Sequence, residues 1–254
     1  MMKQRVLLVG IGLAVLLGNV PQSARAESKQ KKESIVYELR TYTTAEGRLP
    51  ALHKRFRDHT IGLFKKHGMT NVIYWTPQDK DNTLVYLISH QSVEARDKSF
   101  QAFRNDPAWQ KAYKDSIKDG KIVTNVESQF LKPTNYSPKS FAAEPGWIYE
   151  LRTYTTNEGK LPNLNARFAN HTLKLFEKHG IKNVMYSTPV GKKNTLVYVI
   201  AHKDRETANK SWKAFGQDPE WKKVAKESQQ DGPILVKGGV KRLYLKTTDY
   251  SPNK

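Results

Sequence analysis

The sequence predicts an α+β fold in which two tandem ferredoxin-like domains, each with the element order βαββαβ, pack sheet to sheet within one chain. The first observation is a repeat. Residues 37–44 return as residues 149–156, and the spacing of 112 residues holds as far as Gly120 and Gly232. Roughly half of the aligned positions are identical, as expected for a duplicated domain. The second observation is that helices in a βαββαβ unit cover only one sheet face. The bare faces of two copies can therefore pack together as an intrachain pseudo-dimeric α+β barrel.

The residues before the repeat predict a secretory signal peptide. Residues 1–5 are short and positive, residues 6–17 are apolar, and Ala24-Arg25-Ala26 has the small-x-small pattern of a cleavage site. The apolar run is shorter than the ~20 residues that a membrane-spanning helix needs, although an uncleaved anchor is the alternative. We expect cleavage after Ala26 and a secreted or periplasmic mature chain.

The elements of the first copy follow from residue alternation and turn residues. Residues 35–43 alternate and are rich in β-branched and aromatic residues, which predicts a strand. Pro50 opens a helix that ends at Gly68. The remaining predicted elements are strands at residues 71–76 and 83–89, a helix capped by Ser92, and a strand at residues 122–131.

The second copy predicts the same order, with one break in its second helix and one insertion. Asp106-Pro107 and Asp218-Pro219 each offer an N-cap and a helix-opening proline, so the second helix of each copy should split in two. Two extra residues near Gly238-Gly239 predict a bulge or loop in the last strand. The predicted elements are strand 148–155, helix 162–179, strands 183–188 and 195–201, helix 205–230, and strand 240–245. The chain is accordingly divided into a signal peptide (1–26), a polar leader (27–34), domain one (35–138), a linker (139–146) and domain two (147–252).

The amino-acid composition excludes several kinds of reactive site and indicates the charge of a binding partner. The absence of cysteine excludes disulfides, thiolate metal sites and thiol nucleophiles. The net charge of +19 falls to +16 when Lys3, Arg5 and Arg25 leave with the signal peptide. Such a surface attracts an anionic partner, for example an acidic polysaccharide, lipid headgroups or an acidic protein, unless it is a basic surface with no dedicated partner. Nucleic acid is not expected as a partner, because no recognition motif is present and the chain is exported.

The first strand of each copy carries a charged face. Alternation places Glu38, Arg40 and Tyr42 on one face of the strand, opposite a face that contains Leu39. The apolar face suits the helix-covered side, so we expect the charged residues inside the barrel. They would form structural ion pairs or line a polar cavity for a small-molecule ligand, where arginine binds a carboxylate or phosphate. The corresponding residues of the second copy are Glu150, Arg152 and Tyr154.

Histidines supply the other candidates. His59 and His171 follow Phe56 and Phe168 by three residues on the predicted buried stripe of the first helix. We expect either a hydrogen-bonded core residue or a ligand-binding base, with an axial haem ligand as a further alternative. Metal-hydrolase, serine-hydrolase and nucleotide-binding motifs are absent, so no metal site is expected and no catalytic residue is identified. Two further histidines, His90 and His202, end the third strand and are expected at its rim.

Three motifs recur in both copies: the opening Tyr-Glu-Leu-Arg-Thr-Tyr, the Lys-His-Gly after the first helix, and the Asp-Pro-x-Trp of the second. Together they resemble the NIPSNAP family over nearly the whole mature chain. The resemblance implies the dimeric α+β barrel superfamily, which includes cofactor-independent monooxygenases and haem-dependent, chlorite dismutase-like barrels. It implies no generally accepted reaction, and the signal peptide departs from the mitochondrial members.

Three functions follow from this resemblance: an exported binding or interaction protein of the cell envelope, a cofactor-independent monooxygenase-like enzyme, or a haem-binding barrel. Analogy with the family favours the binding protein, and we expect that this protein uses no cofactor. An open polar pocket in the barrel would favour an enzyme, and an interior filled with side chains would favour the binding protein.

Overall fold

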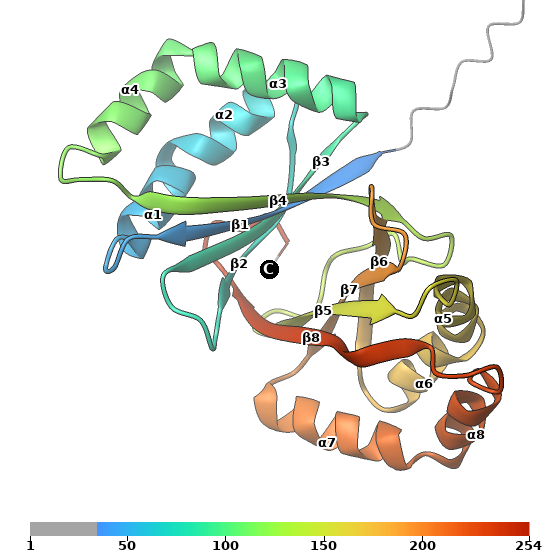
Figure 1. The fold of residues 1–254 in the computed structure, drawn as a ribbon. Helices are drawn as coiled ribbons and strands as arrows, with labels where there is room; N and C mark the ends of the chain where they lie inside the picture. The colour runs from blue at the N-terminus through green and yellow to red at the C-terminus, as the bar shows by residue number, and fades with distance from the viewer. Residues whose placement is uncertain (1–34, 254) are drawn as a thin grey trace, which may run out of the picture. The chain divides into compact units, whose positions relative to one another are not determined.

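The computed structural model describes residues 35–253, and within them eight antiparallel strands close into one barrel (Figure 1). The order around the barrel is β1-β3-β2-β8-β5-β7-β6-β4, so each copy contributes four neighbouring strands. The copies join at two seams, β2 with β8 and β4 with β6. The mixed fold with a closed barrel confirms the predicted class, while residues 1–34, which include the predicted signal peptide and leader, lie outside the described residues. The strands are β1 Val36–Thr44, β2 Thr70–Pro77, β3 Thr83–His90, β4 Val123–Pro133, β5 Ile148–Thr156, β6 Lys182–Pro189, β7 Thr195–His202 and β8 Leu235–Thr247.

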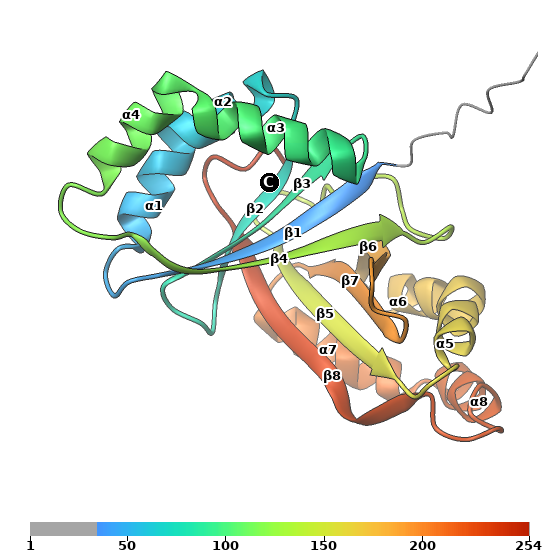
Figure 2. The same cartoon turned by 45° about the horizontal axis from the view of Figure 1, so that its top comes forward.

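The helices lie outside the barrel, α1 to α4 against the strands of the first copy and α5 to α8 against those of the second (Figures 1 and 2). The predicted break in the second helix is confirmed. The Asp106 carboxylate accepts the Ala108 N–H and Asp218 accepts the N–H groups of Glu220 and Trp221, so each aspartate caps a new helix. The helical segments are α1 Leu49–Arg55, η1 Phe56–Thr60, α2 Ile61–Lys66, α3 Val93–Asn105, α4 Pro107–Ser116, α5 Leu161–Arg167, η2 Phe168–Thr172, α6 Leu173–Lys178, α7 Arg205–Gln217 and α8 Pro219–Glu227.

A π-helical turn interrupts the first helix of each copy and overturns the prediction for two histidines. In η1 the Thr60 hydroxyl donates to the Arg55 carbonyl at 3.1 Å. The wide turn lengthens the helical period, so the side chains that face the sheet recur every four residues. Those residues are Leu52, Phe56, Thr60 and Phe64 in the first copy and Leu164, Phe168, Thr172 and Phe176 in the second. His59 and His171 therefore fall off the buried stripe and are exposed.

The barrel interior is filled by large apolar side chains from both copies. Trp75 and Tyr149 lie there with ring centroids 5.6 Å apart, and both are essentially inaccessible to solvent. The linker adds Phe141 and Ala143 to the same cluster, and Trp147, directly after the linker, also packs there. Two further large clusters lie between the sheet and the helices, one in each copy, and a small third cluster lies in the second copy. The interior therefore holds the two copies together as a shared core.

The tail of each copy completes the core of the other. Tyr136, at the end of the first copy, packs in the helix–sheet cluster of the second, and Tyr250 packs in that of the first. The Ser137 hydroxyl accepts the Tyr186 N–H and the Ser251 hydroxyl accepts the Tyr74 N–H, both at 3.0 Å. This reciprocal exchange adds packing and hydrogen bonds between the two copies.

The last strand contains the predicted insertion as a bulge. Its register against β5 shifts between Tyr154 and Thr156, and Gly238 adopts a φ of 72°. A side chain on Gly239 would approach the Thr155 carbonyl to 2.6 Å, so the chain passes too close for any other residue. The strand begins at Leu235, before the bulge, because β8 pairs with β5 on both sides of the bulge.

Candidate functional site

The charged side chains of strand one lie between the sheet and the helices, which reverses the predicted faces. Leu39 packs in the barrel interior, whereas Tyr42 packs in the helix–sheet cluster of the first copy. The Arg40 guanidinium lies 5.0 Å from the ring centroid of Phe100 in α3. Both faces of β1 are covered, and helix α3 supplies the polar partners that the interior lacks. The residues placed inside the barrel by the sequence, Glu38, Arg40, Tyr42, Glu150, Arg152 and Tyr154, are therefore outside it.

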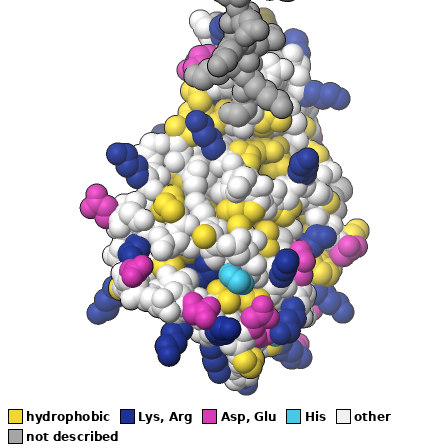
Figure 3. Space-filling view, turned by 90° about the vertical axis from the view of Figure 1, so that its right-hand side faces the viewer, with side chains coloured by type: hydrophobic (Ala, Val, Ile, Leu, Met, Phe, Trp, Pro, Cys, Tyr) yellow, Lys and Arg dark blue, Asp and Glu magenta, His cyan; other side chains and the backbone are white. Residues whose placement is uncertain are grey.

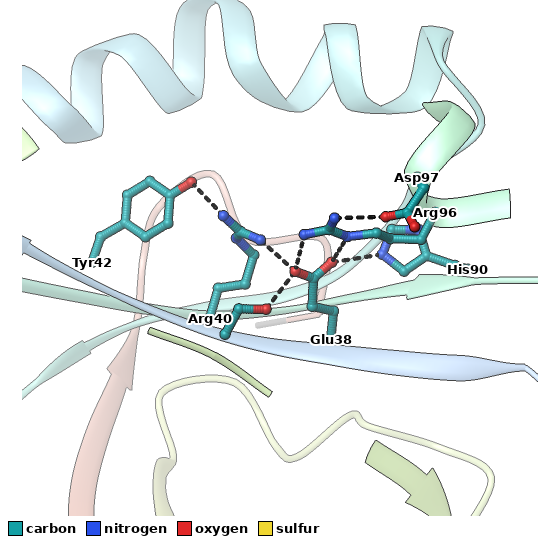
Figure 4. Close-up of polar contacts among 7 residues, drawn as sticks. Glu38, Arg40, Tyr42, His90, Arg96 and Asp97 are labelled. Atoms are coloured by element: carbon teal, nitrogen blue, oxygen red, sulfur yellow. Dashed lines mark hydrogen bonds and ion pairs between the residues drawn. The ribbon is translucent and has the colours of Figure 1, made fainter. Parts of the chain in front are cut away.

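Glu38 is the centre of a buried network in the first copy (Figure 4). Its Oε1 accepts hydrogen bonds from Arg40, from Arg96 Nη2 at 2.9 Å and from the Ser128 hydroxyl at 2.5 Å. Its Oε2 accepts from Arg96 Nε and from His90 Nε2, each at 3.1 Å. Burial alone would raise the pKa of this carboxyl. The bonds from His90, Arg96 and Ser128 and the charge of Arg40 instead hold the pKa well below its usual range.

The network extends from Glu38 along β1 to Tyr42 and through helix α3 to Asp97. Arg40 Nη2 donates to the Tyr42 hydroxyl at 3.2 Å, and Arg96 Nη1 donates to Asp97 at 2.9 Å (Figure 4). Two guanidinium groups thus share one buried carboxylate. With its oxygens occupied and its pKa lowered, Glu38 is a structural anion and a poor proton acceptor.

Glu150 repeats the arrangement with different donors. Its Oε1 accepts from Arg152 Nη1 at 2.5 Å, and its Oε2 accepts from Trp212 Nε1 at 2.8 Å and His202 Nε2 at 3.0 Å. The position of Arg96 is taken by Ala208, so a single arginine faces this carboxylate. Burial raises the pKa of Glu150, but these bonds and the Arg152 charge lower it overall. The Arg152 guanidinium also stacks 4.3 Å from the Trp212 ring centroid.

Several members of these networks were missed by sequence reasoning. His90 and His202 were expected at the rim of the sheet, yet they are 4% and 0% exposed and bind the two glutamates. A histidine at the same end of an apolar strand in both copies was the available signal. Arg96 and Trp212 occupy non-equivalent positions of the helix, so the repeat gave no indication of their role.

A second cluster, present in one copy only, surrounds His53. His53 Nδ1 lies 2.7 Å from the Tyr250 hydroxyl, and Arg57 binds both oxygens of Asp249 at 2.8 Å. His53, Arg57 and Asp249 border a hollow of about 350 Å³. Burial and the Arg57 charge lower the pKa of His53, which favours a neutral imidazole. The second copy has Asn165, Ala169 and Asn135 at the positions of His53, Arg57 and Asp249.

A third feature is a buried arginine in the first helix of each copy, Arg55 and Arg167, which are 5% and 7% exposed. Within residues 35–253, neither guanidinium has a carboxylate within 4.0 Å. Arg55 donates to the Ser116 hydroxyl and Arg167 to the Ser228 hydroxyl. Burial lowers the pKa of both arginines.

Two features are absent from residues 35–253. That part of the chain contains no group of three or more His, Asp or Glu side chains placed to hold a metal ion. None of its helices is long and apolar enough to cross a membrane.

The sequence matches the family model named NIPSNAP twice, over residues 37–138 and residues 149–252. The two matches lie in the two repeats and together cover most of the chain. A comparison with curated proteins found no match.

Solved structures with a similar fold include two candidate monooxygenases. The one from Lactobacillus acidophilus is 11% identical, with a TM-score of 0.57, over 85% of this chain and 94% of that chain. The one from Fusobacterium nucleatum is 13% identical, with a TM-score of 0.58, over 84% and 92%. At these identities the likeness concerns the fold alone. A NIPSNAP family protein of unknown function from Agrobacterium tumefaciens is 27% identical over 42% of this chain and 94% of its own, with a TM-score of 0.38.

Proposed function

The chain belongs to the NIPSNAP family, and we propose that it is an exported binding protein of the cell envelope. In this proposal the barrel is a rigid scaffold, and the basic surface binds an anionic partner. Its partner class is an acidic polysaccharide, with anionic lipid headgroups and an acidic protein as alternatives.

The proposal rests on one observation: the predicted cavity is filled, and its two glutamates are already bound by other side chains. The barrel interior is packed with apolar side chains, and the carboxylates of Glu38 and Glu150 are already held by arginine, histidine and other donors. A catalytic base needs a free lone pair and access to substrate. Neither glutamate offers both, so these residues serve the scaffold.

Charge supports an anionic partner. The full chain carries 43 Lys and Arg against 24 Asp and Glu. Lysine and arginine side chains are spread over the face in Figure 3, interleaved with acidic ones. An excess of this kind raises the local concentration of anions and speeds their association.

A cofactor-independent enzyme related to the monooxygenases is the second candidate. The hollow beside His53 favours it, because a neutral imidazole hydrogen-bonded to the Tyr250 hydroxyl is a potential base. The haem alternative loses its motivating residues, since His59 and His171 are exposed on the outer helices.

Binding to polyanions tests the proposal. The mature protein should bind immobilised polyglucuronate at 50 mM salt and elute by about 200 mM salt, because screening weakens contacts between exposed charges. Dextran beads are the uncharged control, and anionic and neutral vesicles test the lipid alternative. Equal binding to charged and uncharged matrices, or none to any anion, would contradict the proposal. A Soret band in the purified protein would favour haem instead.

Export is tested separately. The Ala24-Arg25-Ala26 pattern predicts that N-terminal sequencing of exported protein will begin at Glu27. A protein that retains Met1 and sediments with membranes would show an uncleaved anchor.

A further inference from the structure

The outer surface of the second copy contains a polar groove between the α5–η2 segment and α8. It has a volume of about 280 Å³, close to the lower end of small-ligand sites. Donor groups dominate its wall. The polar side chains that line it are Asn163, Arg167, Asn170, His171, Glu227 and Ser228.

Arg167 is the unusual member of this wall. It is 93% buried, its Nη1 donates to the Ser228 hydroxyl at 3.3 Å, and its Nε, like that of Arg55, has no partner among the described residues. No carboxylate in that part of the chain neutralises it, although Glu227 stands at the same groove. A buried guanidinium without a counter-ion is costly, and its planar fork matches a carboxylate.

The first copy shows what a purely structural version of this arginine looks like. The Arg55 guanidinium lies 5.5 Å from the Trp109 ring centroid and 5.4 Å from that of Tyr113. Arg167 keeps the first contact, 5.2 Å from Trp221, but the position of Tyr113 is occupied by Ala225. The second copy has therefore lost the aromatic ring that shields the other arginine.

The positions next to Arg167 also differ from the first copy in a way that favours an anion. In the first copy Asp58 follows Arg55 by three residues, within η1, and is bound by Lys54 at 2.6 Å. The second copy has Asn170 and Ala166 at these two positions. A carboxylate that would repel an anion is thus replaced by an amide that can donate to one.

We propose that this groove binds the carboxylate of a small hydroxy acid, with a uronic acid as the representative ligand. Arg167 holds the carboxylate, while the amides of Asn163 and Asn170 and the Glu227 carboxylate hydrogen-bond the hydroxyl groups. A phosphate dianion is disfavoured, because Glu227 adds negative charge to the groove while Arg167 is its one guanidinium. The inference deepens the proposed function, because it names the chemical group of the polyanion that one site recognises.

Isothermal titration calorimetry with D-glucuronate tests the groove. Glucuronate should bind saturably, acetate and inorganic phosphate at least tenfold more weakly, and glucose without detectable heat. Arg167→Gln should weaken glucuronate binding at least tenfold. The matched variant Arg55→Gln, which alters the shielded arginine, should leave it unchanged.

A second variant keeps the test independent of folding. Ala225→Tyr restores the ring of the first copy without removing a buried charge, and it should also weaken glucuronate binding at least tenfold. Unchanged binding in both Ala225→Tyr and folded Arg167→Gln would overturn the proposal, as would phosphate binding more tightly than glucuronate. If these variants lose glucuronate binding but still bind polyglucuronate in a salt-sensitive way, the groove is supported as one site on a wider basic surface. Glucuronate binding without any polyanion binding would refute the proposed function and leave the groove in place.

Discussion

The two copies satisfy the buried glutamate of their first strand with partly different hydrogen-bond donors. Each buries a glutamate against an arginine two residues later and a histidine at the end of the third strand. The first copy adds the charged Arg96 and the Ser128 hydroxyl as donors, and the second copy adds the neutral Trp212. A buried carboxylate needs its hydrogen bonds satisfied, whichever residue supplies them. The repeated motif therefore has an architectural role, and specific binding is better sought where the copies differ.

The largest expected effect comes from removing the glutamates. Glu38→Gln leaves Arg40 and Arg96 without their shared anion, so we expect it to lower the free energy of unfolding by about 3–5 kcal/mol. Glu150→Gln leaves one arginine and a neutral indole, and a smaller loss of about 1–3 kcal/mol is expected. Urea unfolding monitored by tryptophan fluorescence measures both. Losses of equal size would show that Arg96 adds nothing to the network.

Removing the arginines should reverse this order. Arg152→Ala leaves Glu150 with His202 and Trp212 and without an arginine, so a loss of about 3–5 kcal/mol is expected. Arg40→Ala leaves Arg96 on Glu38, and a loss of about 1–3 kcal/mol is expected. The same unfolding experiment compares them. A larger loss for Arg40→Ala would contradict the assignment of Arg96 as the second counter-ion.

The smallest difference between the copies is expected for the helix-capping aspartates. Hydrogen bonds from Lys66 and His67 hold the pKa of Asp106 below its usual range, and those from Lys178 and His179 do the same for Asp218. A carboxyl whose pKa is lower in the folded state stabilises the fold above its unfolded pKa of about 3.9 and loses that contribution as pH falls. The contribution of these two aspartates should be constant between pH 7 and about pH 4 and should fall below pH 4.

Asparagine variants isolate these two aspartates from the other acidic groups. Asp106→Asn and Asp218→Asn should each reduce the acid-induced loss by a similar amount, measured by urea unfolding at pH 7 and pH 3. A fall in stability that neither variant reduces would assign the acid sensitivity to other carboxylates, such as Glu38 and Glu150.

The sequence predicted the closed barrel, the strands and the split helices, because each depends on local pattern or on the repeat. Asp106-Pro107, for example, defines a helix start without tertiary information. The face of strand one was mistaken because Leu39 and Arg40 are both covered, so alternation alone does not identify the barrel side. Arg40 could be placed only with Phe100 and Arg96, which come from a distant helix.

The exposure of the helix histidines and the groove of the second copy could not be predicted for other reasons. The π turn that exposes His59 has no sequence signature, because it departs from the ordinary helical period without a proline or glycine. Ala225 is informative only when it is compared with Tyr113 and when the stacking of Arg55 is known. Differences between aligned copies were thus available in the sequence, but their meaning depended on the packing.

The stoichiometry of D-glucuronate binding tests most directly the claim that recognition resides where the copies diverge. We predict one glucuronate per chain by calorimetry, and at least tenfold weaker binding in the Ala225→Tyr variant. Two equivalent sites per chain would contradict the claim, because ligand would then be recognised by residues that the two copies share.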